Sequence, residues 1–208
     1  MLNYWETLFK EGGALWKFEP SDSAHLALNM FKENHLNSIL IPWFGYGRNA
    51  KLFIEAGFRV TGIEIAQSAI DLAKANGLDC TVHQGSVIAM PFDTSQYDGI
   101  FCYALIHLLN KTERRNFLKA CYHQLKPGGF MVFTVVSKQA NIYGEGTKIS
   151  KDRYRMLNGL SVYFYDSVTV RKEFTDFGLI EYMDFEEPIK FMEGQDPLKC
   201  LLLICKKE

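Results

Sequence analysis

Two glycines and one carboxylate are spaced as in sites that hold the adenosine part of a cofactor. Gly45 and Gly47 belong to the string Gly-Tyr-Gly-Arg-Asn-Ala, which matches the pattern G-x-G-x-x-G/A. Glycines at these positions allow a tight turn and let the backbone approach a ligand closely. Glu64 lies 19 residues after Gly45, where a carboxylate can accept hydrogen bonds from both ribose hydroxyls. The sequence therefore predicts a cofactor loop at residues 45–47 and a ribose contact at Glu64.

The elements that position these residues are indicated by short apolar runs that alternate with amphipathic stretches. The expected strands cover residues 38–43, 59–65, 79–83, 99–103, 130–136, 180–186 and 199–205. Expected helices cover residues 22–31, 49–56 and 67–75. Two more helices are expected after the capping residues Thr112 and Asp166, and they run to Leu125 and Phe177. The string Lys-Pro-Gly-Gly at residues 126–129 is expected to end the first of these two.

This order of elements predicts an α/β fold. Strands that alternate with helices imply right-handed crossovers and a mostly parallel sheet with helices on both faces. The last two strands have no helix between them, so they can form a hairpin in which one strand is antiparallel. We therefore expect a Rossmann-like, seven-stranded, mostly parallel sheet with an antiparallel last strand. The loop at residues 45–47 then follows the first strand, and Glu64 ends the second.

The length and composition favour one domain. The chain has 208 residues, 48% of them apolar, and no repeat or linker divides it, so we expect a single domain over residues 1–208. Two segments lie outside the alternation. Residues 1–37 carry several aromatic side chains and are expected to form an N-terminal cover. Residues 137–165, polar and Gly-rich at first and aromatic at their end, are expected to form a substrate lid inserted into the domain.

Charge and cysteine content bear on partners and location. The net charge of -1 gives no global attraction to nucleic acid or to an anionic membrane. The N-terminus lacks the pattern of a signal peptide, and the apolar run at residues 201–205 is too short to span a bilayer. The five cysteines include no CxxC pair, which favours free thiols in a reducing compartment. We expect a cytoplasmic monomer or homodimer with no nucleic-acid or membrane partner.

From about Ser38 onward the chain resembles the class I S-adenosylmethionine-dependent methyltransferases. The resemblance rests on the strings Gly45-Tyr46-Gly47, Val60-Thr61-Gly62-Ile63-Glu64, Met90-Pro91-Phe92-Asp93, Tyr97-Asp98-Gly99-Ile100 and Leu125-Lys126-Pro127-Gly128-Gly129-Phe130. The last string is the most specific to the family, which also ends its sheet with an antiparallel seventh strand. The stretch from Trp5 to Pro20 looks like the small-molecule branch, near thiopurine- and tellurite-type enzymes. The resemblance implies S-adenosylmethionine as cofactor.

The resemblance also implies which residues contact this cofactor. They are Gly45, Tyr46, Gly47, Asn49, Glu64, Ile65, Ser86, Val87, Tyr103 and Ala104. The family usually has an acidic residue near the cofactor's amino group, where this chain has Ile41. It often has Asp at the adenine, where this chain has Ser86. Ser86 can still form a hydrogen bond there, and Val87 can pack on the adenine ring.

Methyl transfer from a sulfonium needs mainly proximity, alignment and exclusion of water, so no protein nucleophile is required. A base helps when the acceptor must lose a proton. His107 follows the fourth strand, where members of the family often approach the substrate, and is the candidate base. The alternative is a structural histidine at a helix start, bonded to the backbone. The string Cys102-Tyr103-Ala104-Leu105 lacks the motif of nucleic-acid amino-methyltransferases.

Aromatic and basic residues outside the alternation are candidates for substrate contacts. They are Tyr4, Trp5, Trp16, Tyr143 and Arg153. The first three can close over the cofactor, because ring faces attract a sulfonium cation, and Arg153 can pair with an acidic substrate. The alternatives are a core cover or dimer contact for the aromatics and a solvated face for the arginine. The remaining histidines are scattered without zinc-ligand spacing, so no metal site is expected.

The sequence leaves two further functions open beside the favoured one. The glycine loop alone also permits an NAD(P)-binding Rossmann oxidoreductase, which would bind NAD and not S-adenosylmethionine. Ile41 and Ser86 keep open a non-catalytic, methyltransferase-like binding protein. The favoured function is S-adenosylmethionine-dependent methyl transfer to a small-molecule acceptor.

Overall fold

A computed structural model describes residues 2–14, 17–188 and 196–208. The helices are α1 (Leu2–Gly12), α2 (Asp22–Glu33), α3 (Arg48–Glu55), α4 (Gln67–Ala75), α5 (Lys111–Gln124) and α6 (Ser167–Phe174), with the short 3-10 turns η1 (Val87–Ala89), η2 (Ile106–Leu108) and η3 (Thr175–Phe177). The strands are β1 (Ser38–Ile41), β2 (Arg59–Glu64), β3 (Thr81–Gln84), β4 (Tyr97–Cys102), β5 (Leu125–Val136), β6 (Thr147–Ser150), β7 (Arg153–Arg155), β8 (Ser161–Tyr163), β9 (Leu179–Glu187) and β10 (Leu198–Lys206).

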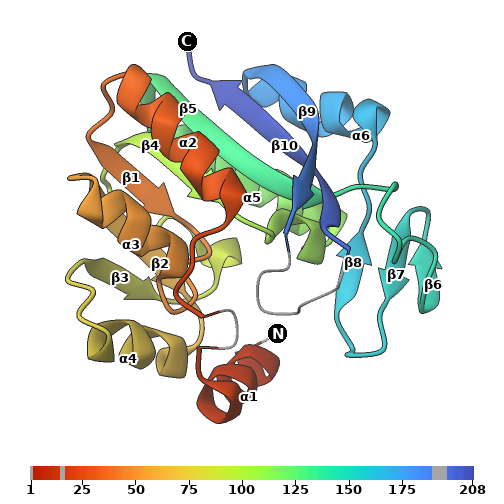
Figure 1. The fold of residues 1–208 in the computed structure, drawn as a ribbon. Coiled ribbons are helices and arrows are strands. Elements are labelled where there is room, and N and C mark those ends of the chain that lie inside the picture. The colour runs from red at the N-terminus through yellow and green to blue at the C-terminus, as the bar shows by residue number, and fades with distance from the viewer. Residues whose placement is uncertain (1, 15–16, 189–195) are drawn as a thin grey trace.

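Seven of the strands form one sheet, in the order β3-β2-β1-β4-β5-β10-β9 (Figure 1). Pairings among β1 to β5 are parallel, as the alternating helices require. Strand β10 pairs antiparallel with both β5 and β9, and Leu203 lies opposite Phe133 and Tyr182. The predicted seven-stranded, mostly parallel sheet with an antiparallel last strand is confirmed.

Helices cover both faces of this sheet. On the face that lies toward the viewer in Figure 1, α2 and α3 pack over β1 and β4. Alternate residues of β1 explain this arrangement, because Ile39 and Ile41 face α2 and α3 while Leu40 faces α5 on the opposite side. Every residue of β1 is buried, as expected for a central parallel strand.

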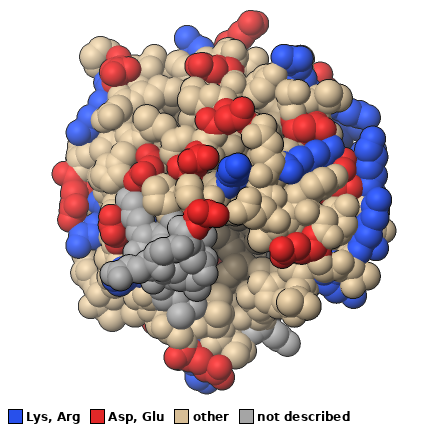
Figure 2. All heavy atoms as spheres, turned by 45° about the vertical axis from the view of Figure 1, so that its right-hand side comes forward, with Lys and Arg blue, Asp and Glu red and all other residues tan. Residues whose placement is uncertain are grey.

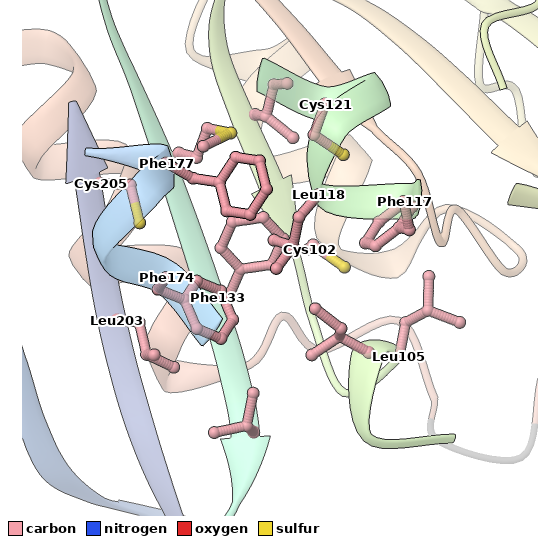
Figure 3. Close-up of a cluster of buried hydrophobic side chains, with 14 of the residues drawn as sticks. Cys102, Leu105, Phe117, Leu118, Cys121, Phe133, Phe174, Phe177, Leu203 and Cys205 are labelled. Carbon is pink, nitrogen blue, oxygen red and sulfur yellow. The ribbon is translucent and has the colours of Figure 1, made fainter. Parts of the chain in front are cut away.

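The core between the sheet and α5 and α6 contains aromatic rings and free thiols (Figure 3). Phe133 of β5 packs against Phe117 and Phe174, at ring-centroid distances of 6.3 and 5.4 Å. Cys102 of β4 lies among these residues, and burial raises its pKa well above the usual value. Cys102 is therefore a neutral thiol of the core and not a nucleophile.

Helix α5 begins two residues earlier than the sequence suggests. The capping residue is Asn110 and not Thr112, because the Asn110 side chain accepts hydrogen bonds from the backbone N–H groups of Thr112 and Glu113. The Glu113 carboxylate accepts in turn from the Asn110 N–H, which completes a capping box. The helix ends at Gln124, and β5 starts at Leu125, so residues 126–129 belong to the strand's entry.

The two segments expected to cover the sheet contain secondary structure of their own. Residues 1–37 include α1 and α2, and α1 packs against α4 below the sheet in Figure 1. Residues 137–165 form a small antiparallel sheet, β6-β7-β8, beside the main one. Their roles as cover and lid, and the single domain over residues 1–208, stay predictions.

The surface carries charges of both signs. On the face shown in Figure 2, acidic and basic side chains are interspersed, in keeping with the net charge of -1. No helix among the described residues is long and apolar enough to cross a membrane.

Candidate functional site

The glycine loop between β1 and α3 is built as the sequence predicts. Gly45 and Gly47 have φ values of +57° and +82°, a backbone region that side chains disfavour. Gly47 is the N-cap of α3, and an added Cβ there would lie 2.4 Å from Leu78. An added Cβ on Gly45 would meet no protein atom within 4 Å, so this part of the loop faces open space. The loop can therefore bring backbone close to a ligand at Gly45.

Glu64 lies directly behind this loop at the end of β2. Its carboxylate accepts hydrogen bonds from the backbone N–H groups of Gly45 at 2.7 Å and of Ile65 and Ala66 at 2.9 Å. Burial raises the pKa of the Glu64 carboxyl, while these three donors oppose the shift. A carboxylate offers about four acceptor sites, but Glu64 is only 1% exposed and lines neither cavity described below, so a ligand would reach its fourth site only if the loop shifts.

Two cavities lie along the loop. The larger, of about 270 Å³, is lined by Trp5, Phe9, Trp43, Phe44, Gly45, Tyr46, Arg48, Asn49, Tyr103, Ala104, Glu187, Pro188 and Leu198. The smaller, of about 20 Å³, is lined by Trp5, Pro42, Trp43, Ile63, Ile65, Gly85, Ser86, Val87, Leu105 and Leu109. Trp5 and Trp43 line both cavities, so they stand between the two.

The cavities bring together most of the residues predicted to contact a cofactor. Gly45, Tyr46, Asn49, Tyr103 and Ala104 line the larger one, and Ile65, Ser86 and Val87 line the smaller one. Gly47 and Glu64 line neither cavity, although the Glu64 carboxylate accepts from the Gly45 N–H. Ile41, in contrast, is buried in the core between the sheet and α2 and lines neither cavity.

The larger cavity has an aromatic side and a polar side. On the polar side the Arg48 guanidinium lies 5.1 Å from the centre of the Tyr103 ring. Burial, followed by the nearby Glu187 carboxylate, raises the pKa of Tyr103, which therefore stays a protonated donor at neutral pH. Glu187 itself accepts hydrogen bonds from the backbone of Asp22 and Ser23, which joins β9 to the start of α2.

Ala104 has an unusual backbone conformation beside Tyr103. Its φ of +52° is rare for a residue with a side chain. The backbone N–H of Ala104 donates to the Thr134 hydroxyl at 2.9 Å, which holds this conformation. Strained residues of this kind gather at ligand sites.

His107 lies near the site but lines neither cavity. It belongs to η2 and is 5% exposed. Burial lowers the pKa of His107 to about 3, so the ring is neutral at pH 7. Its Nδ1 atom has no hydrogen-bond partner among the residues that the structure describes. The expected bond from a structural histidine to the backbone is therefore not seen at Nδ1.

The residues expected to contact a substrate divide into two groups. Trp5 lines both cavities, and Tyr4 packs edge-on against it at 5.0 Å. Tyr143 and Arg153 line neither cavity. Tyr143 donates to Asp152, and Arg153 donates to the backbone carbonyls of Leu108 and Leu109, which joins β7 to the end of η2. Trp16 lies outside the described residues.

Sequence reasoning missed several residues of the larger cavity. Glu187 and Leu198 come from the β9–β10 hairpin, and no local pattern places them beside the glycine loop. The sequence does offer a signal for Trp43, because a large aromatic residue two positions before Gly45 is unusual in a loop of this kind. No cluster of metal-ligating side chains occurs in the described ranges 2–14, 17–188 and 196–208.

One buried donor at the cavities lacks a hydrogen-bond partner among the described residues. The Trp5 indole Nε1 is buried, and the described part of the chain offers it no hydrogen-bond acceptor. Such unsatisfied groups are few in native proteins and call for an explanation. With Gly45 facing open space and an indole donor to satisfy, the residues around the loop fit a ligand that bears an adenosine group.

Comparisons with known proteins agree with this geometry. Residues 43–129 match the family model of a methyltransferase domain. An uncharacterized methyltransferase of Oceanobacillus iheyensis is 30% identical over 101 residues, which cover 49% of this chain and 47% of that relative. The chain thus matches about half the length of this curated relative.

Solved structures share the fold over the whole chain. A 1,6-didemethyltoxoflavin-N1-methyltransferase of Burkholderia thailandensis, with 1,6-didemethyltoxoflavin and S-adenosylhomocysteine bound, has a TM-score of 0.75 at 16% identity, covering 100% of this chain and 87% of that one. TehB from Haemophilus influenzae has a TM-score of 0.66 at 14% identity, covering 98% and 67%. At such identities the likeness establishes a common fold.

Proposed function

We propose that this chain, whose residues 43–129 match the family model of a methyltransferase domain, is a class I S-adenosylmethionine-dependent methyltransferase that methylates a small-molecule acceptor in the larger cavity. The observation that carries the proposal is the pair of cavities on either side of Trp5 and Trp43, at the carboxyl ends of β1, β2 and β4. Ligands of open α/β sheets bind at this edge.

The smaller cavity suits the adenosine part of the cofactor. Ile65 and Val87 offer apolar side chains to a flat ring, and Ser86 offers a hydroxyl. Glu64 accepts from the Gly45 N–H of the loop and is 1% exposed, so a ribose hydroxyl would bind its fourth acceptor site once the loop shifts. The cavity is small, about 20 Å³, so side chains that line it must shift for the adenosine to enter.

The larger cavity suits the acceptor and the methionyl end. When bound, S-adenosylmethionine supplies a methyl group on a positive sulfur, and an acceptor's lone pair displaces the neutral thioether. The chain's part is to align the two and to exclude water. Trp5 and Phe9 of α1, which are 7% and 5% exposed, close this cavity from one side.

The dimensions and chemistry of the larger cavity support a small acceptor. Its volume of about 270 Å³ lies near the lower limit of about 300 Å³ for small-molecule sites. Aromatic side chains form one wall, and Tyr103 and Arg48 present hydrogen-bond donors on the other. An aromatic or heteroaromatic molecule with an oxygen, nitrogen or sulfur that can accept the methyl group fits a cavity with one aromatic and one polar wall.

A protein base is not part of this proposal. Burial lowers the pKa of His107 to about 3, so its neutral ring is a weak base at pH 7, and the ring lines neither cavity. Its role as base stays a prediction that requires η2 to move. The five free cysteines, whose thiols form no disulfide, support a reducing, cytoplasmic location.

The proposal is tested by incubating the protein with S-adenosylmethionine and a panel of small aromatic phenols, thiols and amines. Mass spectrometry measures S-adenosylhomocysteine and the methylated acceptor, which methyl transfer should produce in equal amounts. We expect turnover with at least one acceptor, and loss of it in Tyr103→Leu. Binding of the cofactor without transfer to any member would favour the non-catalytic binding protein instead.

A further inference from the structure

We propose that Trp43, together with Trp5, recognises the positive charge on the cofactor's sulfur and so makes the site prefer S-adenosylmethionine to its neutral product. The inference rests on the proposed function and goes one step further, because it assigns the discrimination between substrate and product to one pair of rings. Neither the glycine-loop pattern nor the ribose carboxylate distinguishes these two ligands, which share the same adenosine.

The position of Trp43 carries the inference. It lies between β1 and α3, and together with Trp5 it lines both cavities. The two indole rings are 4.9 Å apart between centroids and meet edge to face at 82°. Trp43 is half-buried and Trp5 is buried, so a ligand that joins the two cavities must pass against these rings.

The constitution of the cofactor places its charge at this junction. Its sulfur joins the adenosyl part to the methionyl part, so a ligand with adenosine in one cavity and the methionyl end in the other has its sulfur between them. A cation within about 6 Å of an aromatic ring is attracted by the ring's negative face, and tryptophan is the best of the aromatic side chains. The neutral thioether of the product receives no such attraction.

Carboxylates do not fill this role at the junction. The family's usual acidic position is Ile41, which is 2% exposed and buried in the core. Glu64 accepts three backbone hydrogen bonds at the loop. Glu187 accepts from the first residues of α2 and lines only the larger cavity. The aromatic pair is thus the feature that faces both cavities at once.

The Trp5 indole N–H adds a second contact. It is buried, and the structure gives it no acceptor within the described residues. A ligand oxygen at the junction, from the ribose or from the methionyl carboxylate, would satisfy it. This contact is common to both ligands, so it contributes affinity without discrimination.

The test measures affinities of S-adenosylmethionine and S-adenosylhomocysteine by calorimetry for the wild type and for Trp43→Phe, Trp43→Leu and Trp5→Phe. Tyr122→Leu, which removes a ring near the far end of the sheet beside Phe177, is the matched control. Thermal unfolding confirms that each variant is folded.

We expect Trp43→Leu to lower the preference for S-adenosylmethionine by roughly 3- to 20-fold, and Trp43→Phe to retain most of it. Trp5→Phe keeps a ring and should weaken both ligands alike. An equal loss for both ligands in Trp43→Leu would mean that Trp43 only packs, and it would overturn this inference alone. A wild type that binds neither ligand would overturn the proposed function as well.

Discussion

At the glycine loop, single residues decide how a ligand can meet the backbone. Gly45 leaves open space, whereas Gly47 is closed in by Leu78 and Phe44. The sequence predicts both glycines, because their conformational freedom follows from the residue type. It does not reveal that Glu64 holds the loop through the Gly45 N–H, since this contact depends on how β1 and β2 pair.

Replacing Glu64 with Ala should weaken S-adenosylhomocysteine binding by about 1.5–3 kcal/mol, because a charged acceptor is lost from the ribose. The same change removes the acceptor of three backbone N–H groups, so stability also falls. To separate the two effects, binding of the 2′-deoxy analogue is measured in parallel by calorimetry. An equal loss for both ligands would contradict a contact between Glu64 and the 2′-hydroxyl.

At the scale of elements, local signals were the most informative. The closing hairpin and the cap of α6 at Asp166 agree with the sequence, since both depend on neighbouring residues. The sheet of β6, β7 and β8 was not predicted as strands, because β6 is exposed along its whole length and shows no alternation. For α5 the sequence suggests Thr112 as the N-cap, whereas the side chain of Asn110 accepts the capping hydrogen bonds.

The start of α5 offers a matched pair of variants. Asn110→Ala should lower the free energy of unfolding by about 1 kcal/mol, since the N-cap acceptor is lost. Thr112→Ala changes an exposed side chain of the first turn and should cost much less. Urea unfolding of both variants decides the matter, and a larger loss in Thr112→Ala would contradict the capping box seen here.

At the scale of the whole molecule, the site depends on segments distant in sequence. Residues of α1, the glycine loop, the end of β4 and the β9–β10 hairpin all line the larger cavity. Sequence patterns locate the loop and the end of β4, because motifs mark them. The contribution of Glu187 and Leu198 could not be predicted, since it arises from the path of the chain over the sheet. His107 is likewise buried by this packing.

Stability should respond to pH through His107. Its pKa in the folded protein, about 3, is below the unfolded value of about 6.5. The unfolded state therefore binds more protons between these values, and stability is lost as pH falls below 6.5. Glu64, whose pKa is raised, acts in the opposite direction, so a variant is needed to isolate the histidine.

Between pH 7.5 and pH 5 the wild type should lose about 2 kcal/mol more unfolding free energy than His107→Gln. Urea unfolding at the two pH values measures this difference. Equal losses in the two proteins would show that the imidazole takes up its proton in the folded state, and a base accessible to the site would then return to consideration.

The central claim is that the two cavities along the glycine loop hold S-adenosylmethionine. Calorimetric titration of the purified protein with S-adenosylmethionine, S-adenosylhomocysteine and NAD tests it most directly. The account predicts saturable one-to-one binding of the first two ligands and none of NAD. Binding of NAD alone, or of none of the three, would contradict it.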